Sequence, residues 1–453
     1  VFQIESRAQM SCLPRMRPDT FYDIVVQVAI IRPGPIVGNM LHPYLRRRQG
    51  MEAPESLHPS LDQVLKRTMG VPLFQEQLLR MAMIAANFTG GEAEDLRRAM
   101  GFKRSQKRMA DVEERLRKGM NANGITGKAQ DAIVQSITAF ALYGFPESHA
   151  ASFALLSYAS AYLKERYLAA FTVAILNNQP MGFYSPSTLV KDAQRHGLRV
   201  LPVDITVSDW LCTIEERDGA LCLRLGLNYV KGLRKVVAEA LVGERPFLSI
   251  DELKRRVPAV SKEELYRLAE LGAFNKVGGS QQRHRRDAVW QASLAAKPSG
   301  PLFEAGGDAP SPLAPMEDID RLHADFRNSG LSIGKHPMHF ARERLDQQGV
   351  LRAGDLWRVA DDRFVHVAGL VICRQQPQTA KGFVFLSLED ETGVSNIIVP
   401  PKLFTQVRTT VLQHSYLLVG GVLQNQRGAI SIRARKVGPV RNAQVAVKSH
   451  DFR

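Results

Sequence analysis

The run DLRRAMGFKRSQKRM, residues 95–109, contains six Lys or Arg side chains and one acid. Paired arginines can bind phosphate oxygens bidentately, and a lysine adds a point charge beside them. Arg97, Arg98 and Lys103 are therefore candidate ligands for a phosphate group. The alternative is a solvated charged face whose cations stabilise the C-terminus of a helix.

A helix must hold these arginines. Thr89 followed three residues later by Glu92 is a capping box, which predicts a helix that begins here and ends near Gly101. Arg97 and Arg98 would lie on the flanks of its buried stripe. The apolar residues of that stripe would be Ala93, Leu96 and Met100.

The segment YGFPESHAASFALLSY, residues 143–158, joins a Gly-Phe-Pro loop to a second predicted helix. Ser148 would cap this helix, and His149 would lie in its first turn with Tyr143 nearby. Aromatic rings at a helix N-terminus suit a nucleotide or a template strand, because rings stack on bases and N–H groups bind phosphate. A purely structural His149 is the alternative.

A second basic cluster, YLRRRQG at residues 44–50, follows the segment RPGP at 32–35. The two prolines fix the chain in an extended turn and would hold Arg32 on a stiff loop. Rigid placement favours a substrate-binding arginine, and an arginine that stabilises a domain corner is equally consistent.

Several catalytic motifs are absent from the sequence, including a G-x-x-x-x-G-K-[ST] loop, an H-E-x-x-H pair and a G-x-S-x-G elbow. Asp318 and Asp320 form a D-x-D pair off any predicted strand, whereas two-metal phosphoryl transfer needs rigidly placed carboxylates. We expect surface acids on a helix there and no metal site. The four cysteines lack C-x-x-C spacing, which predicts neither zinc nor disulfides and favours a reducing cytoplasm.

Charge and length limit the classes of function. A formal net charge of +15 and a pI near 9.8 make a polyanion the leading partner class. A chain of 453 residues predicts about three domains. No apolar run approaches about 18 residues and the N-terminus lacks a signal-peptide pattern, so we expect no membrane segment.

Helical spacing dominates residues 1–200, as in FYDIVVQVAII and QLLRMAMIAANF, which predicts one large helical domain. Two strand-like runs flank RDGA and predict a hairpin. GLNYVKGLRKVVAEALV and SKEELYRLAELGAFNKVGG then each join a helix to a glycine-containing turn. This pattern predicts a helix-hairpin-helix domain at 201–295 that can bind a phosphate backbone, although an ordinary helix-turn-helix packing unit is equally consistent.

Composition changes again after residue 295. AKPSGPLFEAGGDAPSPLAP predicts a linker, which together with a short helical segment occupies residues 296–352. Four or five short strands follow within 353–453 and predict a barrel of the OB type, whose open face commonly binds single-stranded nucleic acid. The expected fold class is therefore α+β and multidomain.

Seven motifs in collinear order resemble the fingers region of bacterial C-family DNA polymerases, the alpha subunits of DNA polymerase III. They are VFQIESRAQM, RPGPI, HPYLRRRQG, GVPLFQEQ, DLRRAMG, YGFPESHAASFALLSY and NNQPMGFYSP. The variants ESRAQM, FPESHAASFALL and QPMGFYSP are more similar to the error-prone, damage-inducible branch. The helix-hairpin-helix and OB predictions fall where this family has such domains, so the resemblance covers essentially the whole chain.

The resemblance implies template-directed addition of deoxynucleotides to a primer, in translesion synthesis during DNA repair. Arg97 and Arg98 match an arginine pair that lies over the incoming triphosphate, with Lys103 as a third ligand. Template or nucleotide contacts are expected from Arg32, Tyr143, Ser148 and His149. Contacts with the DNA backbone are expected from Arg46, Arg47, Arg48, Lys107, Arg108 and Lys231.

The family's three metal-binding aspartates lie in the palm, ahead of the VFQIES motif at which this chain starts. We therefore expect a C-terminal fragment of a DNA-directed DNA polymerase, inactive by itself, with Mg²⁺ held by upstream palm aspartates. The expected partners are primer-template DNA, deoxynucleoside triphosphates and translesion accessory proteins, in the bacterial cytoplasm at the nucleoid.

Clamp binding is expected to be indirect, through an accessory protein. Leu302 and Phe303 in SGPLFEAG are the nearest match to the clamp peptide of replicative members but lack its Gln, and a stray apolar pair is the alternative. Two other functions stay open: a non-catalytic nucleic-acid-binding module built on the two C-terminal domains, and a structural scaffold for accessory proteins.

Overall fold

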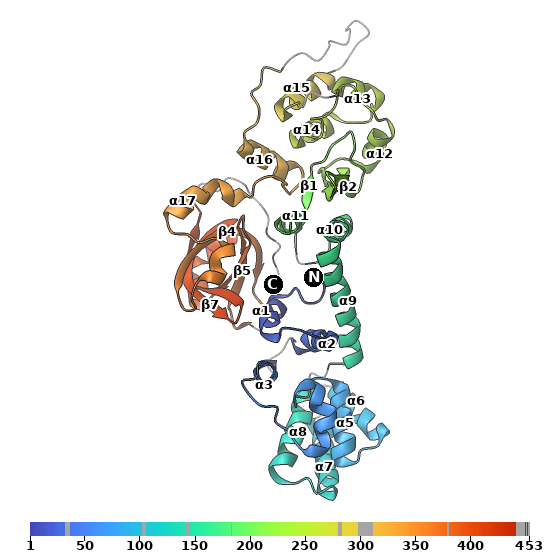
Figure 1. Ribbon diagram of the computed structural model, residues 1–453, viewed down its shortest axis with the longest axis vertical. Helices are drawn as coiled ribbons and strands as arrows, with labels where there is room; N and C mark the ends of the chain where they lie inside the picture. The colour runs from blue at the N-terminus through green and yellow to red at the C-terminus, as the bar shows by residue number, and fades with distance from the viewer. Residues whose placement is uncertain are drawn as a thin grey trace. The chain divides into compact units, whose positions relative to one another are not determined.

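The chain folds into two compact units in a computed structural model (Figure 1). The first unit comprises Val1–Tyr162 with Gln426–Ala429, and the second comprises Leu163–Asn425 with Ile430–Arg453. Each unit is described by itself. The structure describes residues 1–31, 37–101, 106–141, 145–182, 184–279, 283–297, 311–377, 380–440, 449 and 451, without the side chains of 37–42, 99–101, 106–109, 138–141 and 426.

The first unit is helical, as the spacing of its apolar residues predicts. Thr20 and Asp23 form a reciprocal capping box at the start of α2, and the side chain of Ser6 accepts a hydrogen bond from the backbone N–H of Gln9 at the start of α1. The α-helices are α1 (Arg7–Met16), α2 (Phe21–Ile30), α3 (Val37–Arg48), α4 (Asp62–Leu65), α5 (Gln75–Ala86), α6 (Gly90–Gly101), α7 (Gln106–Ala122), α8 (Gly127–Ala141) and α9 (Glu147–Arg166), of which α9 continues into the second unit. Short 3₁₀ turns are η1 (Pro59–Leu61) and η2 (Lys66–Thr68).

Two apolar cores hold the first unit together. Helices α5 to α8 form a bundle (Figure 1) around one core, whose central residues include Leu78, Met81, Leu96, Leu116 and Ile133. The second core joins α1 and α2 to the first half of α9, through Val26, Tyr44, Phe74, Ala150 and Ala154. The bundle supports α6, which carries the arginine pair.

Helix α7 packs so closely on α5 that a Cβ atom at Gly119 would lie against the backbone carbonyl of Ala86. Overpacking of this kind costs about 1–3 kcal/mol, against about 1 kcal/mol gained in helix propensity. We expect Gly119→Ala to speed amide hydrogen exchange in α5 and α7. Gly91→Ala in α6 meets no atom within 4 Å and is the matched control, so equal exchange in the two variants would contradict this packing.

The second unit starts with two helices and a small sheet. Strand β3 is central, pairing in parallel with β1 and antiparallel with β2. The predicted hairpin at RDGA is confirmed, since β2 and β3 are joined by Asp218 and Gly219, both with positive φ. The elements are α10 (Leu168–Asn177), α11 (Pro186–Arg195), β1 (Arg199–Leu201), β2 (Thr213–Arg217) and β3 (Ala220–Arg224).

Short helices follow, and those up to residue 295 pack on a core that includes Leu241, Leu253, Leu268 and Phe274. Ser261 and Glu264 form the capping box of α14, and Gly272 ends that helix with a positive φ of 80°. The elements are η3 (Leu227–Tyr229), α12 (Lys235–Gly243), α13 (Ile250–Arg256), α14 (Lys262–Leu271), α15 (Arg285–Ala295), α16 (Asp318–Asn328), η4 (Pro337–Ala341), α17 (Arg342–Gln347) and η5 (Ala353–Arg358).

The C-terminal strands close into a five-stranded barrel of the OB type, in the order β4-β5-β6-β8-β7, with β7 paired back onto β4. Side chains alternate inward and outward along β4, so Val365 and Val367 enter the barrel core. This confirms the predicted α+β multidomain class. The elements are β4 (Phe364–Gln375), β5 (Val384–Glu389), β6 (Val394–Val399), α18 (Pro401–Gln413), β7 (Tyr416–Gln426) and β8 (Ala429–Pro439).

Two glutamates make the stability of the second unit depend on pH. Hydrogen bonds from Arg224 lower the pKa of Glu215 to about 2. Burial acts to raise the pKa of Glu264, but hydrogen bonds from Arg234 and other partners outweigh it and lower that pKa to about 2. Both values lie below the unfolded value near 4.3, so the stabilisation is present above about pH 4.3 and is lost as the pH falls towards 2.

We therefore expect the urea midpoint of the second unit to fall between about pH 5 and about pH 2. Tryptophan fluorescence measures this unit alone, because Trp210, Trp290 and Trp357 all lie in it. The variant Glu215→Gln/Glu264→Gln should have a flatter profile over this range. A wild-type midpoint that stays constant would contradict the lowered pKa values.

Candidate nucleotide and nucleic-acid site

The arginine pair lies on the last turns of α6, on the helix that the capping box predicts. Glu92 Oε2 accepts a hydrogen bond from the backbone N–H of Thr89 at 2.7 Å, and the N–H of Glu92 donates to Thr89 Oγ1 at 3.3 Å. The helix ends at Gly101, as predicted. Its stripe is confirmed where it is described, because Ala93 and Leu96 are buried, and the side chain of Met100 lies outside the described residues.

One carboxylate, that of Glu94, binds both arginines. Arg97 donates to it through Nε at 2.8 Å and Nη2 at 2.6 Å, and Arg98 donates through Nε at 3.3 Å. The hydrogen bond from Arg97 is the largest cause that lowers the pKa of Glu94, to about 2. The side chains of Arg97 and Arg98 are 47% and 69% exposed, so they can exchange this carboxylate for an external oxyanion.

Several predicted ligands fall outside the described residues. These are Arg32, Lys103 and Tyr143, and the clamp-like pair Leu302 and Phe303. Lys107 and Arg108 belong to α7, but their side chains also lie outside the described part.

The start of α9 corrects one prediction. The helix begins at Glu147, so Ser148 lies inside its first turn and does not cap it, and the Ser148 carbonyl accepts a hydrogen bond from Ser152 Oγ. Glu76 instead accepts from the backbone N–H of Glu147 at 2.9 Å, and Tyr22 donates its hydroxyl proton to Glu147 Oε1 at 2.8 Å. A carboxylate of the chain thus already occupies one N–H group that was expected to meet phosphate.

His149 lies between two aromatic rings. Its ring centroid is 5.1 Å from that of Phe145 and 4.4 Å from that of Phe153, and Phe153 stacks on Phe2 at 5.7 Å. Both His149 and Ser148 are exposed. This column supports the structural alternative for His149 and leaves a contact with a nucleotide as a prediction.

The three arginines of the basic cluster on α3 have different partners. Arg46 is exposed and pairs with Glu52 at 2.8 Å. Arg47 donates to the carbonyl of Met69 at 2.8 Å, and Arg48 donates to Asp23 at 3.0 Å. Two of the three arginines therefore tie α3 to other parts of the first unit, and contacts of all three with DNA stay a prediction.

Lys231 lies before the turn into α12. Its ammonium group donates to the carbonyls of Phe326 at 2.8 Å and Arg327 at 3.2 Å, near the C-terminus of α16. Gly232 follows with a φ of 74°, and a Cβ there would collide with the guanidinium of Arg267. The turn is therefore fixed by contacts within the second unit, and a contact of Lys231 with DNA stays a prediction.

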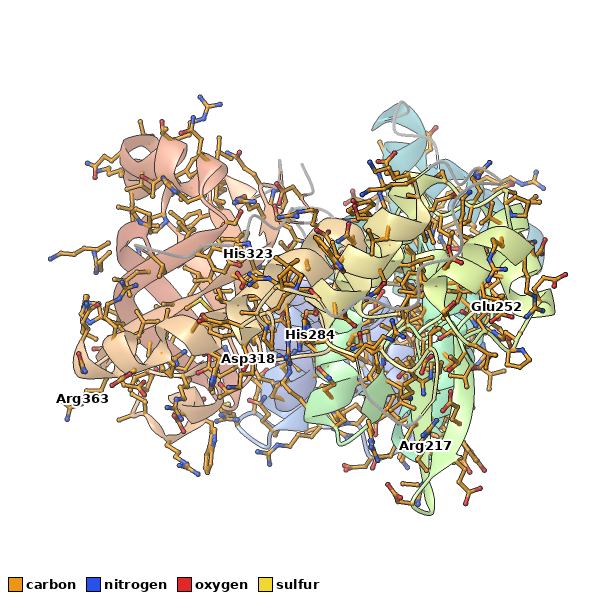
Figure 2. All side chains as sticks on the ribbon, turned by 90° about the horizontal axis from the view of Figure 1, so that it is seen from above. Arg217, Glu252, His284, Asp318, His323 and Arg363 are labelled. Atoms are coloured by element: carbon orange, nitrogen blue, oxygen red, sulfur yellow. The ribbon has the colours of Figure 1, made fainter. Side chains whose placement is uncertain are left out.

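The acids at the start of α16 are surface acids on a helix, as predicted. Asp318, labelled in Figure 2, lies 3.3 Å from Lys335, and Asp320 lies 2.9 Å from Arg286. Within the described ranges, no group of three or more His, Cys, Asp or Glu side chains could hold a metal ion. Among the same residues, no helix is both long and apolar enough to cross a membrane.

The sequence of this chain is similar to those of known proteins. The finger domain of the bacterial DNA polymerase III alpha subunit matches residues 1–124, and the helix-hairpin-helix motif matches residues 197–285. Over its whole length the chain is 47% identical to the error-prone DNA polymerase of Anaeromyxobacter dehalogenans and 43% identical to that of Methylococcus capsulatus. The chain thus matches the DNA polymerase III alpha-subunit family, and over its whole length it is similar to members that are named error-prone DNA polymerases.

The chain spans 40% and 45% of the lengths of these two relatives. The matches confirm the family named by the seven collinear motifs, and the finger match contains the α6 arginine pair. Among solved structures, an asparaginyl-tRNA synthetase from Pyrococcus horikoshii aligns with 22% of this chain and 23% of its own at 17% identity, with a TM-score of 0.16.

Sequence patterns missed three residues that contact the predicted site residues or their helices: Glu94, Tyr22 and Glu76. Glu94 could have been found, because it lies three and four residues before the two arginines on one helix. Tyr22 and Glu76 could not, because they reach Glu147 across 125 and 71 residues.

Proposed function

We propose that this chain supplies the fingers and the C-terminal DNA-binding domains of an error-prone DNA polymerase that acts in translesion synthesis. Residues 1–200 would form the fingers, 201–295 the helix-hairpin-helix domain, 296–352 a connecting segment and 353–453 the OB domain. The observation that carries the proposal is the exposed Arg97–Arg98 pair on capped α6, inside the segment that matches polymerase fingers.

In the proposed reaction the primer 3′-hydroxyl attacks the α-phosphorus of a deoxynucleoside triphosphate, and pyrophosphate leaves. Arg97 and Arg98 bind the triphosphate and stabilise the negative charge that shifts onto the leaving group. The described residues offer no ligand set for the Mg²⁺ that the family resemblance implies, so the part of this chain is to bind and orient. Primer-template DNA would contact the helix-hairpin-helix and OB domains, and accessory proteins would provide the link to the sliding clamp.

Primer extension by a full-length polymerase that carries this chain tests the proposal. We expect addition of the templated nucleotide to a primer and extension past a lesion. A protein that binds primer-template DNA but extends no primer would instead support the non-catalytic nucleic-acid-binding module, which the helix-hairpin-helix match and the closed barrel favour.

Loss of the Glu94 carboxylate should change KM for the nucleotide in the opposite direction to loss of an arginine. Because its carboxylate binds both arginines, it competes with the triphosphate for the same donors. We expect Glu94→Gln to lower KM for the nucleotide, measured in steady-state primer extension. Glu113→Gln is the control, because it removes one carboxylate from Arg117 on α7, which keeps its ion pair with Asp131, and it should leave KM unchanged. A raised KM for Glu94→Gln would mean that Glu94 orients the arginines for substrate.

A further inference from the structure

A cavity of about 310 Å³ lies within the second unit, where α11, residues 334–339 and the turn between β5 and β6 meet. Five of its lining side chains are cationic or can become so: Lys191, Arg195, Lys335, His336 and His339. Its volume is at the lower end of the range for small-ligand pockets. None of these residues belongs to the arginine site on α6.

Lys191 is a buried ammonium group without a counter-ion. The residue is 7% exposed, and its Nζ donates to Gln194 Oε1 at 3.0 Å and to the carbonyl of Gly334, both neutral acceptors. Among the ion pairs of the described residues, none includes Lys191. Burial lowers the pKa of Lys191 to about 8, although Glu389 and Asp325 act to raise it. Buried charges are normally paired, so this cation lacks an anion.

The carboxylates around Lys191 are already bound to other cations. Glu389 pairs with Arg195 at 2.7 Å. Asp325 pairs with Arg285 at 2.7 Å, and the Glu391 that lines the cavity accepts from Arg342 Nη2 at 3.1 Å. None of the three is therefore available to neutralise Lys191.

His336 adds a buried ring nitrogen that has no hydrogen-bond partner. Its Nδ1 accepts a hydrogen bond from the backbone N–H of Met338 at 3.1 Å, so the neutral ring carries its proton on Nε2. That Nε2 is buried and has no hydrogen-bond partner; Glu389 Oε2, at 3.7 Å, is too distant. The residue is 6% exposed, so bulk water does not satisfy this donor.

We propose that this cavity binds a phosphate group. Phosphate presents several strong acceptors to the ammonium of Lys191, to Arg195 and to the exposed Lys335 and His339, and supplies the missing negative charge. The phosphate could be free, as inorganic phosphate or pyrophosphate, or could belong to a DNA backbone. Only the assignment to a DNA backbone rests on the proposed function.

The test is calorimetric titration of the 453-residue chain with inorganic phosphate and with pyrophosphate. With inorganic phosphate we expect saturable binding that weakens as the pH rises above about 8, where Lys191 loses its proton and the charge of the phosphate no longer changes. Lys335→Ala/His339→Ala changes two exposed side chains and should weaken binding at least about tenfold. Lys402→Ala on α18, an exposed lysine of the same unit, should leave it unchanged. Lys191→Met should abolish the pH dependence, with tryptophan fluorescence confirming the fold.

A second arm identifies the source of the phosphate. If pyrophosphate competes with primer-template DNA and the double variant loses DNA affinity, the cavity binds the backbone. If pyrophosphate binds while DNA affinity is unchanged in the double variant, the cavity binds the free anion, whether or not the proposed polymerase function holds. Absence of anion binding together with unchanged DNA affinity in the double variant overturns the proposal, as does anion binding that the double variant and Lys191→Met leave intact.

Discussion

Replacing Arg97 and Arg98 together with alanine is expected to lower kcat/KM for nucleotide incorporation about 10²–10⁴-fold in a full-length polymerase that carries this chain. A hydrogen bond to a charged group contributes about 1.5–3 kcal/mol, and about 1.4 kcal/mol corresponds to a factor of ten. Two such contacts with a triphosphate account for the expected loss. Single-turnover primer extension at varied nucleotide concentration measures it.

The stability of the protein should change little, because both arginine side chains are exposed and bind only Glu94 among the contacts described. Arg80→Ala/Lys118→Ala is the matched control, because it removes two exposed cations of the same unit from α5 and α7. An equal loss of kcat/KM in the control would mean that the effect comes from the change in net charge. An unchanged kcat/KM in the Arg97 and Arg98 variant would mean that the pair does not bind the triphosphate.

Loss of the carboxylate at Glu215 is expected to destabilise the second unit by about 3 kcal/mol. Arg224 is 1% exposed, and its guanidinium donates to Glu215 through Nε at 2.6 Å and Nη2 at 3.0 Å. Glu215→Ala leaves that buried cation with the carbonyl of Pro202 as its other acceptor. We expect a lower urea midpoint, measured by tryptophan fluorescence.

A pair of variants separates the ion pair from simple loss of packing. Glu215→Leu/Arg224→Met removes both charges and should unfold at a higher urea concentration than Glu215→Ala, because no uncompensated charge stays buried. If the double variant is the less stable of the two, then packing of the Arg224 side chain outweighs its charge. A loss below about 1 kcal/mol in Glu215→Ala would mean that water reaches Arg224.

Local patterns in the sequence predicted local structure well. The Thr89–Glu92 capping box, the described part of the α6 stripe and the hairpin at Asp218 and Gly219 all depend on residues a few positions apart, and all are confirmed. The strands of the barrel were found from their alternation. Their closure, with β7 paired back onto β4, depends on contacts that alternation does not specify.

Contacts between residues far apart in the chain explain the structural features that the sequence did not predict. The clustered Arg46, Arg47 and Arg48 looked alike, but Arg47 and Arg48 bind groups that lie 22 and 25 residues away. Helix α9 begins two residues earlier than a cap at Ser148 predicts, and Glu76, 71 residues earlier in the chain, accepts a hydrogen bond from the N–H of its first residue. The carbonyl that binds Lys191 lies 143 residues further along the chain.

The most direct test of the central claim is titration of the templated nucleotide onto a complex of the full-length polymerase with template and dideoxy-terminated primer. The claim is that Arg97 and Arg98 bind the triphosphate and not the DNA backbone. It predicts that Arg97→Ala/Arg98→Ala raises Kd for the nucleotide at least about tenfold and changes Kd for primer-template DNA less than about twofold. Weaker DNA binding with an unchanged Kd for the nucleotide would contradict it.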